Sequence, residues 1–379
     1  MIMSRRHLLG KLAATAATGA AFHTLSDFSL AQVSPARANF FPAPIILSRN
    51  ENAYGPSERV LAAMREAVSG GNRYPAAEHD LLINKIAALH RVRPEQIVLG
   101  CGSSEILGIA AAAFLGPEKK FVQASPTCPL LGQLARNSGA EVVDVPLTKM
   151  YEHDLGAMLA RADASTGLIY ICNPNNPTGT LTTRKDIETF IGKLPANTMV
   201  LIDEAYHHFV SSTSTYSSFL DRPFNDGRVM IARTFSKIYG LAGMRIGYVV
   251  ASPDIAPRLS KHVLQFGVGT VSARIAAAAL DDSEYVSIAA KRNANDRQEF
   301  MNQVNARMLR ALDSHTNFVM MKSPRPVDQV LEHLKKNNIL VAPPIPEMNQ
   351  YIRISLGTPA DMLQFWRVWD LMPSQKMDM

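Results

Sequence analysis

Apolar positions along this chain follow two spacings. From about residue 97, short apolar runs rich in β-branched residues alternate with stretches that have helical periodicity. Continuous apolar strands separated by helices are typical of a mostly parallel sheet that is covered on both faces. The strands expected in this sheet are 97–100, 121–123, 141–145, 167–172, 199–203, 229–232 and 246–250, and one of the helices between them is 103–115.

A second group of elements follows toward the C-terminus. Helical patterns cover about 254–265 and 283–312, and short strands are expected at 317–321, 339–341 and 351–355. These elements predict a smaller α+β domain beside the large α/β domain. The expected organisation is an export signal over 1–38, an N-terminal arm and part of the small domain over 39–70, a large domain over 71–275 and a small C-terminal domain over 276–379. Within the second range, residues 39–56 are expected to be extended.

The first 38 residues have the layout of an export signal. Paired Arg5 and Arg6 precede a weakly apolar run rich in alanine, threonine and glycine, and small-residue cleavage patterns follow at 29–31 and 36–38. This layout resembles a twin-arginine signal and predicts use of the export machinery and a periplasmic location. The alternative is an ordinary amphipathic first helix with a chance arginine pair, in a cytoplasmic protein. The apolar run is too short for a stable membrane span.

Charge and cysteine content exclude several classes of protein. The chain has 379 residues and a formal net charge of +6, of which the first 38 residues contribute +3. The remaining +3 is too small to indicate nucleic-acid or membrane binding. The three cysteines are far apart, and no two of them have CxxC spacing. The sequence therefore predicts no disulfide framework and no metal site.

Polar residues are concentrated where the expected strands end. In open α/β sheets, ligands bind beyond the carboxyl ends of the strands. The sequence NPNNPTG occupies 173–179 after one strand, DEAY occupies 203–206 after another, and GCGSSE at 100–105 opens a helix. The helix start could bind a phosphate group. Taken singly, each has a plainer explanation: a turn, a helix cap for the acid at the strand end, or simple capping by the glycine-rich segment.

The stretch RTFSKIYGLAGMRIGY, 233–248, contains two cations with no acidic neighbour in the sequence. Lys237 and Arg245 are separated by mostly apolar and glycine residues. A lysine in an apolar setting has a lowered pKa and is a good nucleophile toward aldehydes. A solvated loop lysine is the usual fate of a Ser-Lys pair, so this stretch alone is weak evidence. In combination and in this order, however, the four segments match the requirements of pyridoxal phosphate, which needs a lysine, a pyridinium partner and a phosphate cup.

With these motifs, the sequence resembles the fold-type I pyridoxal-phosphate aminotransferases of classes I and II, nearest the histidinol-phosphate aminotransferase branch, over about residues 45–370. The resemblance implies the aspartate-aminotransferase-like α/β fold. It also implies that the cofactor is bound by Lys237, Ser103, Ser104, Asn176, Asp203, Tyr206, Thr234, Ser236, Arg245, Tyr74 and Cys128.

The resemblance assigns a role to each part of this set. Lys237 would form a Schiff base with the cofactor and then move a proton between the substrate α-carbon and the cofactor. Asp203 would pair with the pyridine nitrogen, and Asn176 and Tyr206 would hydrogen-bond the phenolate oxygen. The phosphate would be held by backbone and hydroxyl groups and by Arg245, which explains why this arginine has no acidic neighbour.

Three further matches concern substrate and partner. Arg353, in YIRIS, matches the family arginine that binds the substrate α-carboxylate, and Tyr54, in ENAYGP, matches a residue that faces the substrate pocket. Asn176 is expected to bind substrate as well as cofactor. Tyr74, in NRYP, matches the tyrosine that reaches the phosphate of a neighbouring subunit. The resemblance thus implies a homodimer with shared active sites, acting on an amino acid and a 2-oxo acid.

The sequence departs from the family at two positions. Cys128 stands where the family usually has an aromatic residue stacked on the cofactor ring, and Ala342 stands where histidinol-phosphate enzymes have an arginine that helps bind the substrate phosphate. Without that cation, phosphate binding should be weaker by several kcal/mol, by analogy with truncating one partner of a charged pair. Ala342 therefore argues against histidinol phosphate as the substrate. A reactive thiol at Cys128 is the less favoured reading.

Other functions remain open on the same fold. The enzyme could be a histidinol-phosphate transaminase proper, or a pyridoxal-phosphate-dependent decarboxylase, racemase or lyase. Arg353 favours transamination. A silent regulatory protein is disfavoured because the motif residues are all present and the N-terminal stretch is occupied by the export signal.

Overall fold

The computed structural model describes residues 43–211, 215–222 and 225–373. The predicted export signal and its twin arginines lie outside these residues. From Pro44 onward, the described residues belong to one compact unit. None of the helices described is both long and apolar enough to cross a membrane.

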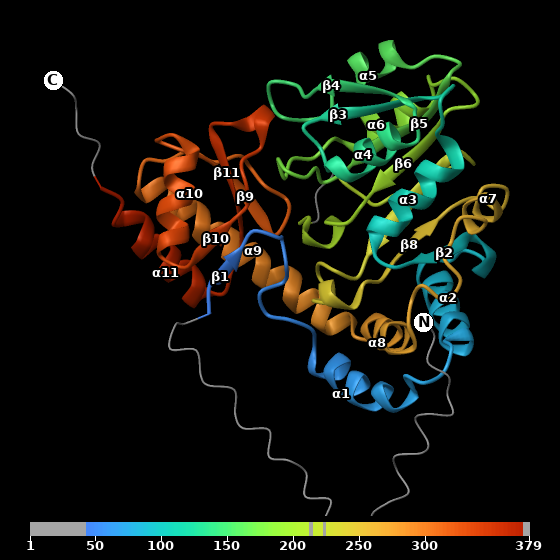
Figure 1. Ribbon diagram of the computed structural model, residues 1–379, viewed down its shortest axis with the longest axis horizontal. Helices are drawn as coiled ribbons and strands as arrows, with labels where there is room; N and C mark the ends of the chain where they lie inside the picture. Colours follow the sequence, from blue (N-terminus) through green and yellow to red (C-terminus); the bar gives the residue numbers. More distant parts are fainter. Residues whose placement is uncertain (1–42, 212–214, 223–224, 374–379) are drawn as a thin grey trace, which may run out of the picture. The chain divides into compact units, whose positions relative to one another are not determined.

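A seven-stranded sheet forms the centre of the larger part of this unit (Figure 1). Its strands lie in the order β2-β8-β7-β6-β5-β3-β4. Their bounds are β2 (Ile97–Gly100), β3 (Lys120–Ser125), β4 (Glu141–Pro146), β5 (Thr166–Cys172), β6 (Met199–Asp203), β7 (Val229–Thr234) and β8 (Gly247–Val250). β8 is antiparallel to both of its neighbours, β2 and β7, and the other pairs of strands in this sheet are parallel. The fold class predicted from the apolar runs, a mostly parallel sheet covered by helices, is confirmed.

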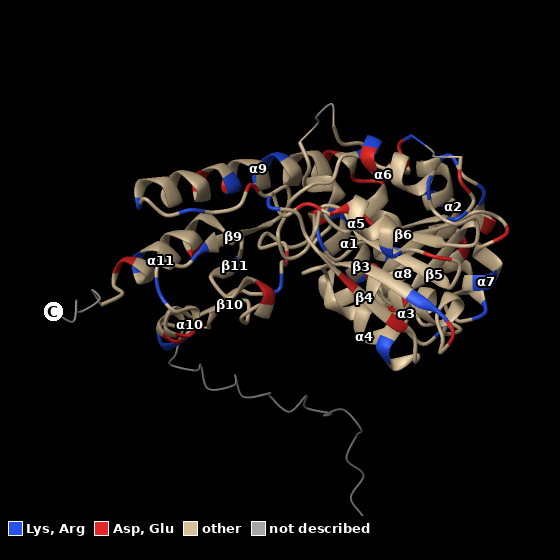
Figure 2. Ribbon diagram, turned by 90° about the horizontal axis from the view of Figure 1, so that it is seen from above, with Lys and Arg blue, Asp and Glu red and all other residues tan. Residues whose placement is uncertain are grey.

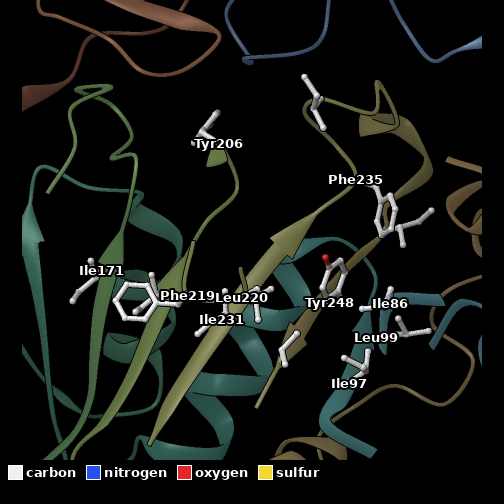
Figure 3. Packing of buried hydrophobic residues seen from close by; sticks show 14 of the residues in the cluster. Ile86, Ile97, Leu99, Ile171, Tyr206, Phe219, Leu220, Ile231, Phe235 and Tyr248 are labelled. Atoms are coloured by element: carbon white, nitrogen blue, oxygen red, sulfur yellow. The ribbon is translucent and has the colours of Figure 1, made fainter. Parts of the chain in front are cut away.

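Helices cover both faces of this sheet. They are α1 (Glu58–Ala67), α2 (Ala76–His90), α3 (Ser103–Phe114), α4 (Pro129–Asn137), α5 (Leu155–Arg161), α6 (Arg184–Ile191), α7 (Ala256–Ser260) and α8 (Thr270–Leu280). Side chains that alternate along the strands divide into two buried clusters. One contains Ile171 and Ile231 with residues of α1, α2, α5, α6 and α8 (Figure 3); the other contains Tyr170 and Ala232 with residues of α3, α4 and α7. The apolar runs are therefore buried on both faces, as parallel strands require.

Two smaller sheets and three helices form the remainder. They are β1 (Ile45–Leu47), β9 (Phe318–Lys322), β10 (Ile339–Val341), β11 (Tyr351–Ser355), α9 (Ser283–Ala306), α10 (Val327–Lys336) and α11 (Pro359–Asp370). β9 pairs antiparallel with β11, whereas β10 pairs in parallel with β1, which comes from the N-terminal arm. A third buried cluster, with Phe300, Phe365 and Trp366, packs these elements together. Helix α9 contributes to this cluster and, through Ala289, to a cluster of the large sheet.

Several local predictions need correction. The helix expected at 254–265 is the single short helix α7, because the chain turns at Lys261 and continues in a loop to Gly269. The helix expected at 283–312 ends at Ala306, where Met308 takes a left-handed conformation. Helix α8, an alanine-rich segment, was not predicted. The arm 39–56 is not wholly extended, since residues 53–54 form a turn.

Charged residues are spread over the unit. Lys and Arg positions are interspersed with Asp and Glu positions along the outer helices (Figure 2). This mixed distribution is consistent with the small net charge of the chain beyond residue 38.

Candidate active site

The site lies at the carboxyl ends of β5, β6 and β7. Strand register places Cys172 beside Asp203, and Asp203 beside Ala232. The loops that follow these three strands therefore begin next to one another. The N-terminal arm crosses this edge, and its residues 48–52 contact both the loops and β11. Segments about 300 residues apart in the sequence are thus brought to one place.

Lys237 reaches the arm from the loop after β7. Its Nζ donates hydrogen bonds to the carbonyl oxygens of Asn50 at 3.0 Å and Arg49 at 3.2 Å, and it lies 5.5 Å from the centre of the Tyr206 ring. Burial, and secondarily the positive charge of Arg353, lower the pKa of Lys237 from 10.5 to about 8. The neutral amine, which is the form that attacks an aldehyde, is therefore far more populated near physiological pH than in an ordinary lysine.

Asp203 is buried at the end of β6, with 4% of its surface exposed. The hydroxyl of Tyr170 donates to its Oδ2 at 2.8 Å, and the backbone N–H of Ala205 donates to its Oδ1 at 3.0 Å. Burial raises the pKa of Asp203, while these two hydrogen bonds act in the opposite direction. A buried carboxylate with a raised pKa is suited to a cationic partner, which would favour its charged form.

Arg353 on β11 faces the loop after β5. Its Nη1 donates to Asn176 Oδ1 at 2.6 Å and its Nη2 donates to the Ser48 carbonyl at 2.9 Å. Its Nε is buried without a hydrogen-bond partner, and burial lowers the pKa of the guanidinium. A buried guanidinium with an unused donor is ready to bind a carboxylate through two parallel hydrogen bonds.

Tyr206 is held by a residue that the sequence did not indicate. Its hydroxyl accepts a hydrogen bond from Asn50 Nδ2 at 3.0 Å, and burial raises the pKa of Tyr206. Asn50 is itself buried, with φ of 54°, and its Oδ1 accepts from Ser355 Oγ at 3.0 Å. Asn50 therefore links the arm to Tyr206, to Lys237 and to β11. Its role depends on contacts 156 to 305 residues away, which local sequence cannot report.

A cradle lies where α3 begins. Gly102, with φ of 78°, precedes the helix, and no side chain caps the first turn at Ser103 and Ser104. A Cβ on Gly102 would lie 2.3 Å from Arg245 Nη2, and a Cβ on Gly247 would lie 2.5 Å from the Ser103 nitrogen. Both glycines are needed so that the guanidinium and the helix N-terminus can lie side by side.

This arrangement places positive charge against positive charge. The N-terminus of a helix carries a partial positive charge, so a guanidinium beside it is unfavourable unless an anion lies between them. Arg245 Nη1 also donates to the Ala242 carbonyl at 2.9 Å and to Ser236 Oγ at 3.5 Å. The Thr234 hydroxyl accepts from the Ser236 N–H at 3.0 Å. The residues fit a phosphate group.

Partners of opposite charge are missing for the same residues. Within the described part of the chain, none of Asp203, Lys237, Arg245 and Arg353 forms an ion pair with a protein group. Pyridoxal phosphate has a partner for three of them: its pyridinium nitrogen for Asp203, its aldehyde for Lys237 and its phosphate for Arg245. The residues present therefore fit pyridoxal phosphate.

The remaining predicted residues have different surroundings. Tyr54 donates from its hydroxyl to Asp296 Oδ2 at 2.9 Å, and the guanidinium of Arg292 lies 4.3 Å from its ring, so it contacts α9. Tyr74 is 80% exposed and stacks on Phe266 at 5.1 Å. Among the described residues of one chain, Tyr74 forms no hydrogen bond or ring contact with the other predicted site residues.

Cys128 lies beside the acid of the site. It is the residue before α4, and burial raises the pKa of its thiol, followed by the negative charge of Asp203. A raised pKa disfavours the thiolate, which is the reactive form. The raised pKa therefore favours a packing role for this thiol over a reactive one.

The chain is similar to known proteins over most of its length. A sequence model of the family described as "Aminotransferase class I and II" matches residues 42–367. Histidinol-phosphate aminotransferase 2 of Carboxydothermus hydrogenoformans is 36% identical, over 84% of this chain and 88% of that protein. Histidinol-phosphate aminotransferase of Staphylococcus carnosus is 37% identical, over 83% and 86%.

A solved structure agrees with these matches. The crystal structure of histidinol-phosphate aminotransferase from Sinorhizobium meliloti in complex with pyridoxal-5'-phosphate superposes with a TM-score of 0.81 at 27% identity, covering 92% of this chain and 100% of that one. The matched residues include every element that forms the site, from the arm to β11. The chain belongs to the class I and II aminotransferase family.

Proposed function

We propose that this protein is a pyridoxal-phosphate-dependent aminotransferase that transfers an amino group between an amino acid and a 2-oxo acid. The observation that carries this proposal is the meeting of the Lys237 amine, the buried Asp203 carboxylate and the Arg353 guanidinium at one strand edge. Bound pyridoxal phosphate supplies an aldehyde and an electron-withdrawing ring that stabilises negative charge at the substrate α-carbon.

The chain's own residues would divide the remaining work. Lys237 would hold the cofactor covalently and, when its amine is free, would take and return a proton at its Nζ. Asp203 would pair with the ring nitrogen and favour its protonated form. Arg353 binds the substrate α-carboxylate, using its free Nε–H and a terminal N–H, and so orients the α-carbon toward Lys237.

The substrate proposed here differs from that in the names of the relatives. Position 342 is an alanine, and its backbone N–H donates to the Arg353 carbonyl at 3.2 Å, so the residue lies directly beside the carboxylate-binding arginine. A phosphorylated substrate would find no second arginine at this position. The proposed substrates are therefore an amino acid and a 2-oxo acid, rather than histidinol phosphate.

A titration of the purified holoenzyme tests the activity. Amino acids are added one at a time while the visible absorption of the bound cofactor is followed. We expect at least one amino acid to convert the cofactor to its amine form and a 2-oxo acid to restore the original spectrum. Carbon dioxide release, racemised product or side-chain elimination without that cycle would indicate decarboxylation, racemisation or a lyase reaction instead.

The same proposal includes a homodimer with shared sites. Tyr74 and Phe266 form an exposed aromatic pair, 80% and 37% exposed, which a second subunit would cover. Mixing inactive Lys237→Ala subunits with Tyr74→Ala subunits provides the test. In a shared-site dimer, one of the two mixed sites has both native residues, so exchange of subunits restores activity. No restoration after confirmed exchange would contradict shared sites.

Export through a twin-arginine signal completes the proposal. It is supported by Arg5 and Arg6, by the apolar run that follows and by the small-residue cleavage patterns. Replacing Arg5 and Arg6 by lysine keeps the local charge but removes the arginine pair. We expect the variant to remain in the cytoplasm, as judged by fractionation. Unchanged export would overturn the assignment of the signal.

A further inference from the structure

A cleft with a volume of about 440 Å³ opens at the carboxylate-binding arginine. Its wall includes Arg353 and Asn176, which already belong to the active site, and extends to α4 and to the loop after β10. This volume lies within the usual range for small-molecule sites of about 300–1,000 Å³. Since a substrate carboxylate at Arg353 would lie at this wall, the cleft is where the substrate side chain can extend.

The wall of this proline-lined cleft combines an apolar proline surface with the neutral polar side chains of Gln123, Ser125, Thr127, Gln133 and Asn176. Six prolines contribute to it, three from the large part of the fold and three from the loop after β10: Pro126, Pro129, Pro177, Pro343, Pro344 and Pro346. Ile345 and Ala342 also line it. Proline has no backbone N–H to donate, so these residues offer apolar surface and few polar contacts. The proline surface can stabilise the carbon chain of a long substrate side chain by burial.

The charged residues of the cleft do not favour a second anion. Besides Arg353, they are Arg136, Asp144 and Glu347. Arg136 Nη2 is bound to Asp144 Oδ2 at 2.7 Å, and Asp144 Oδ1 accepts from Gln123 Nε2 at 2.7 Å. Once Arg353 has bound the α-carboxylate, the other three groups carry a net charge of −1. A phosphate or carboxylate at the far end of a substrate would therefore meet net repulsion and no free cation.

A cationic side chain is not matched either. Both oxygens of Asp144 are already engaged, and Glu347 is exposed to solvent, where ion pairs contribute little. A cation in the cleft would lose water against the prolines without gaining a buried partner. The charge balance and the proline surface thus both favour a large, uncharged side chain.

We propose that the proline-lined cleft is the side-chain pocket of the active site and selects amino acids with large, uncharged side chains. This inference rests on the proposed aminotransferase activity and names its substrate class. Ala342 is the position that sets the class, because it is 2% exposed, lies next to Arg353 and adds no second cation to the wall.

Substrate pairs of similar length test the wild-type enzyme. L-norleucine and L-methionine are compared with L-glutamate and O-phospho-L-homoserine, and the rate at which each converts the bound cofactor is measured in single turnovers. We expect the uncharged members to react at least about tenfold faster, because a charged side chain would be placed in the cleft without a free partner of opposite charge. Equal rates, or faster conversion by the anionic members, would overturn the proposal.

Two variants at one position isolate the effect of charge. Ala342→Arg places a cation beside Arg353, and Ala342→Met is the control of similar length without charge. We expect Ala342→Arg to shift the preference toward O-phospho-L-homoserine and L-glutamate by about tenfold or more relative to Ala342→Met. The same preference in both variants would contradict a role for charge at this position.

Failure of the inference can be told apart from failure of the proposed function. If no amino acid converts the cofactor in the wild type or in either variant, the aminotransferase proposal itself is wrong. If amino acids convert it without regard to side-chain charge, transamination stands and the assignment of the pocket falls. Circular dichroism and cofactor absorption of each variant confirm that the protein tested is folded and loaded.

Discussion

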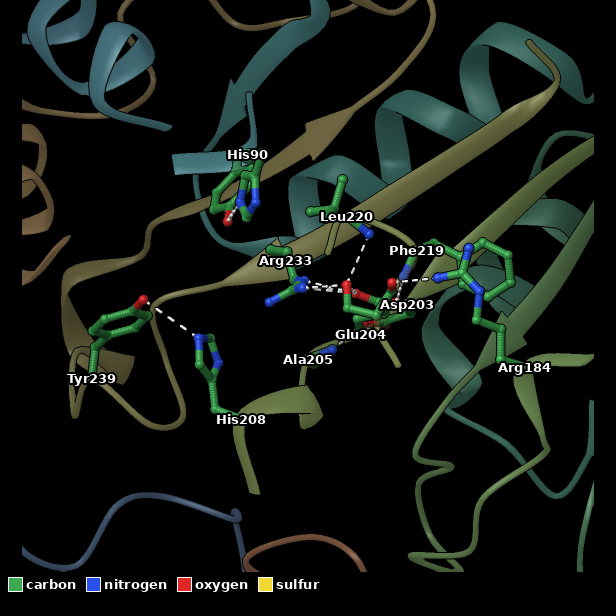
Figure 4. A network of polar contacts seen from close by, with 12 residues as sticks. His90, Arg184, Asp203, Glu204, Ala205, His208, Phe219, Leu220, Arg233 and Tyr239 are labelled. Atoms are coloured by element: carbon green, nitrogen blue, oxygen red, sulfur yellow. Dashed lines mark hydrogen bonds and ion pairs between the residues drawn. The ribbon is translucent and has the colours of Figure 1, made fainter. Parts of the chain in front are cut away.

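Two polar clusters lie back to back at the end of the central sheet, and they differ in how far their groups are satisfied. The first, the active site, contains Asp203 and Lys237. The second, the Glu204–Arg233 network, contains Glu204, which follows Asp203 in the sequence, and Arg233, which precedes Thr234 (Figure 4). Successive residues of an extended strand point to opposite faces, so these neighbours in sequence belong to different clusters.

The Glu204–Arg233 network is closed. Glu204 and Arg233 are 2% and 3% exposed, and Arg233 Nε donates to Glu204 Oε2 at 2.9 Å. The hydroxyl of Ser218 donates to Glu204 Oε2 at 2.7 Å and accepts from Arg233 Nη2 at 2.7 Å, while the Phe219 N–H donates to Glu204 Oε1 at 2.9 Å. A buried ion pair with its remaining hydrogen bonds made can persist without a ligand.

The active site is open by comparison. Arg353 Nε is buried without a partner, and burial displaces the pKa of Asp203 upward and that of Lys237 downward. These are the groups that a cofactor and a substrate carboxylate would complete. The comparison teaches that buried charge alone does not identify a site; incompletely paired buried charge does.

The largest expected effect is on the open cluster. Lys237→Ala should lower turnover by about 10⁴-fold or more, because both the covalent attachment and the proton transfer depend on its amine. The unfolding temperature should change little, since Lys237 makes only two hydrogen bonds to backbone carbonyls. Turnover, cofactor absorption and thermal unfolding are measured together, with exposed Lys335→Ala as the matched lysine control. Wild-type turnover in Lys237→Ala would refute the assignment of the site.

The closed cluster should respond in the opposite way. Arg233→Met leaves Glu204 buried and unpaired, which should lower the free energy of unfolding by about 3–5 kcal/mol. Adding Glu204→Gln removes the uncompensated charge and should restore part of this loss. Lys336→Met, which breaks an exposed pair with Glu332, should cost less than about 1 kcal/mol. Denaturant titration measures all three, and equal losses for the buried and exposed pairs would contradict the comparison.

A smaller effect is expected at Tyr170, which contacts Asp203 at the edge of the active site. Tyr170→Phe removes the hydroxyl that donates to Asp203 Oδ2. Such a hydrogen bond to a charged group contributes roughly 1.5–3 kcal/mol, so turnover should fall about tenfold as Asp203 holds the ring-nitrogen proton less well. Nitrogen NMR of cofactor labelled at the ring nitrogen reports that proton directly.

Tyr248→Phe is the matched control for this change. It removes another buried tyrosine hydroxyl, which is bonded to His90 Nε2 at 2.8 Å on the opposite face of the sheet. It should lower stability without shifting the ring-nitrogen signal. If both variants shift the signal equally, or neither does, Tyr170 has no specific role in positioning Asp203.

The comparison also explains what the sequence could predict. The alternation of apolar strands and helices placed β2 to β8 in one sheet, and the polar residues at their ends identified Asp203 and Lys237 as neighbours. Tyr170 was missed because it stands inside an uninterrupted apolar run and resembles a core residue. Its partner depends on register: Tyr170 lies beside Leu201 on the adjacent strand, two residues before Asp203.

The arm was less predictable for a similar reason. Three apolar residues, Ile45–Leu47, are too few to indicate a strand, and their partner β10 lies almost 300 residues later. Asn50 follows directly and acquires its function only when that pairing has brought the arm across the strand edge. Contacts of this kind are set by tertiary packing, which a local pattern does not contain.

The smallest expected effect concerns pH and tests how open the active site is. Because burial and Arg353 lower the pKa of Lys237 from 10.5 to about 8, the neutral amine becomes available as pH rises through 8. The rate at which cofactor-free protein attaches pyridoxal phosphate should therefore rise about threefold between pH 7.5 and 8.5 and level off above pH 9.

An acetylated lysine amide serves as the control, and its rate should keep rising toward pH 10.5. Arg353→Met removes the neighbouring positive charge, so its midpoint should move upward from that of the wild type. A wild-type midpoint near 10.5 would mean that Lys237 is an ordinary solvated lysine, and that the contrast between the open and closed clusters does not extend to its amine.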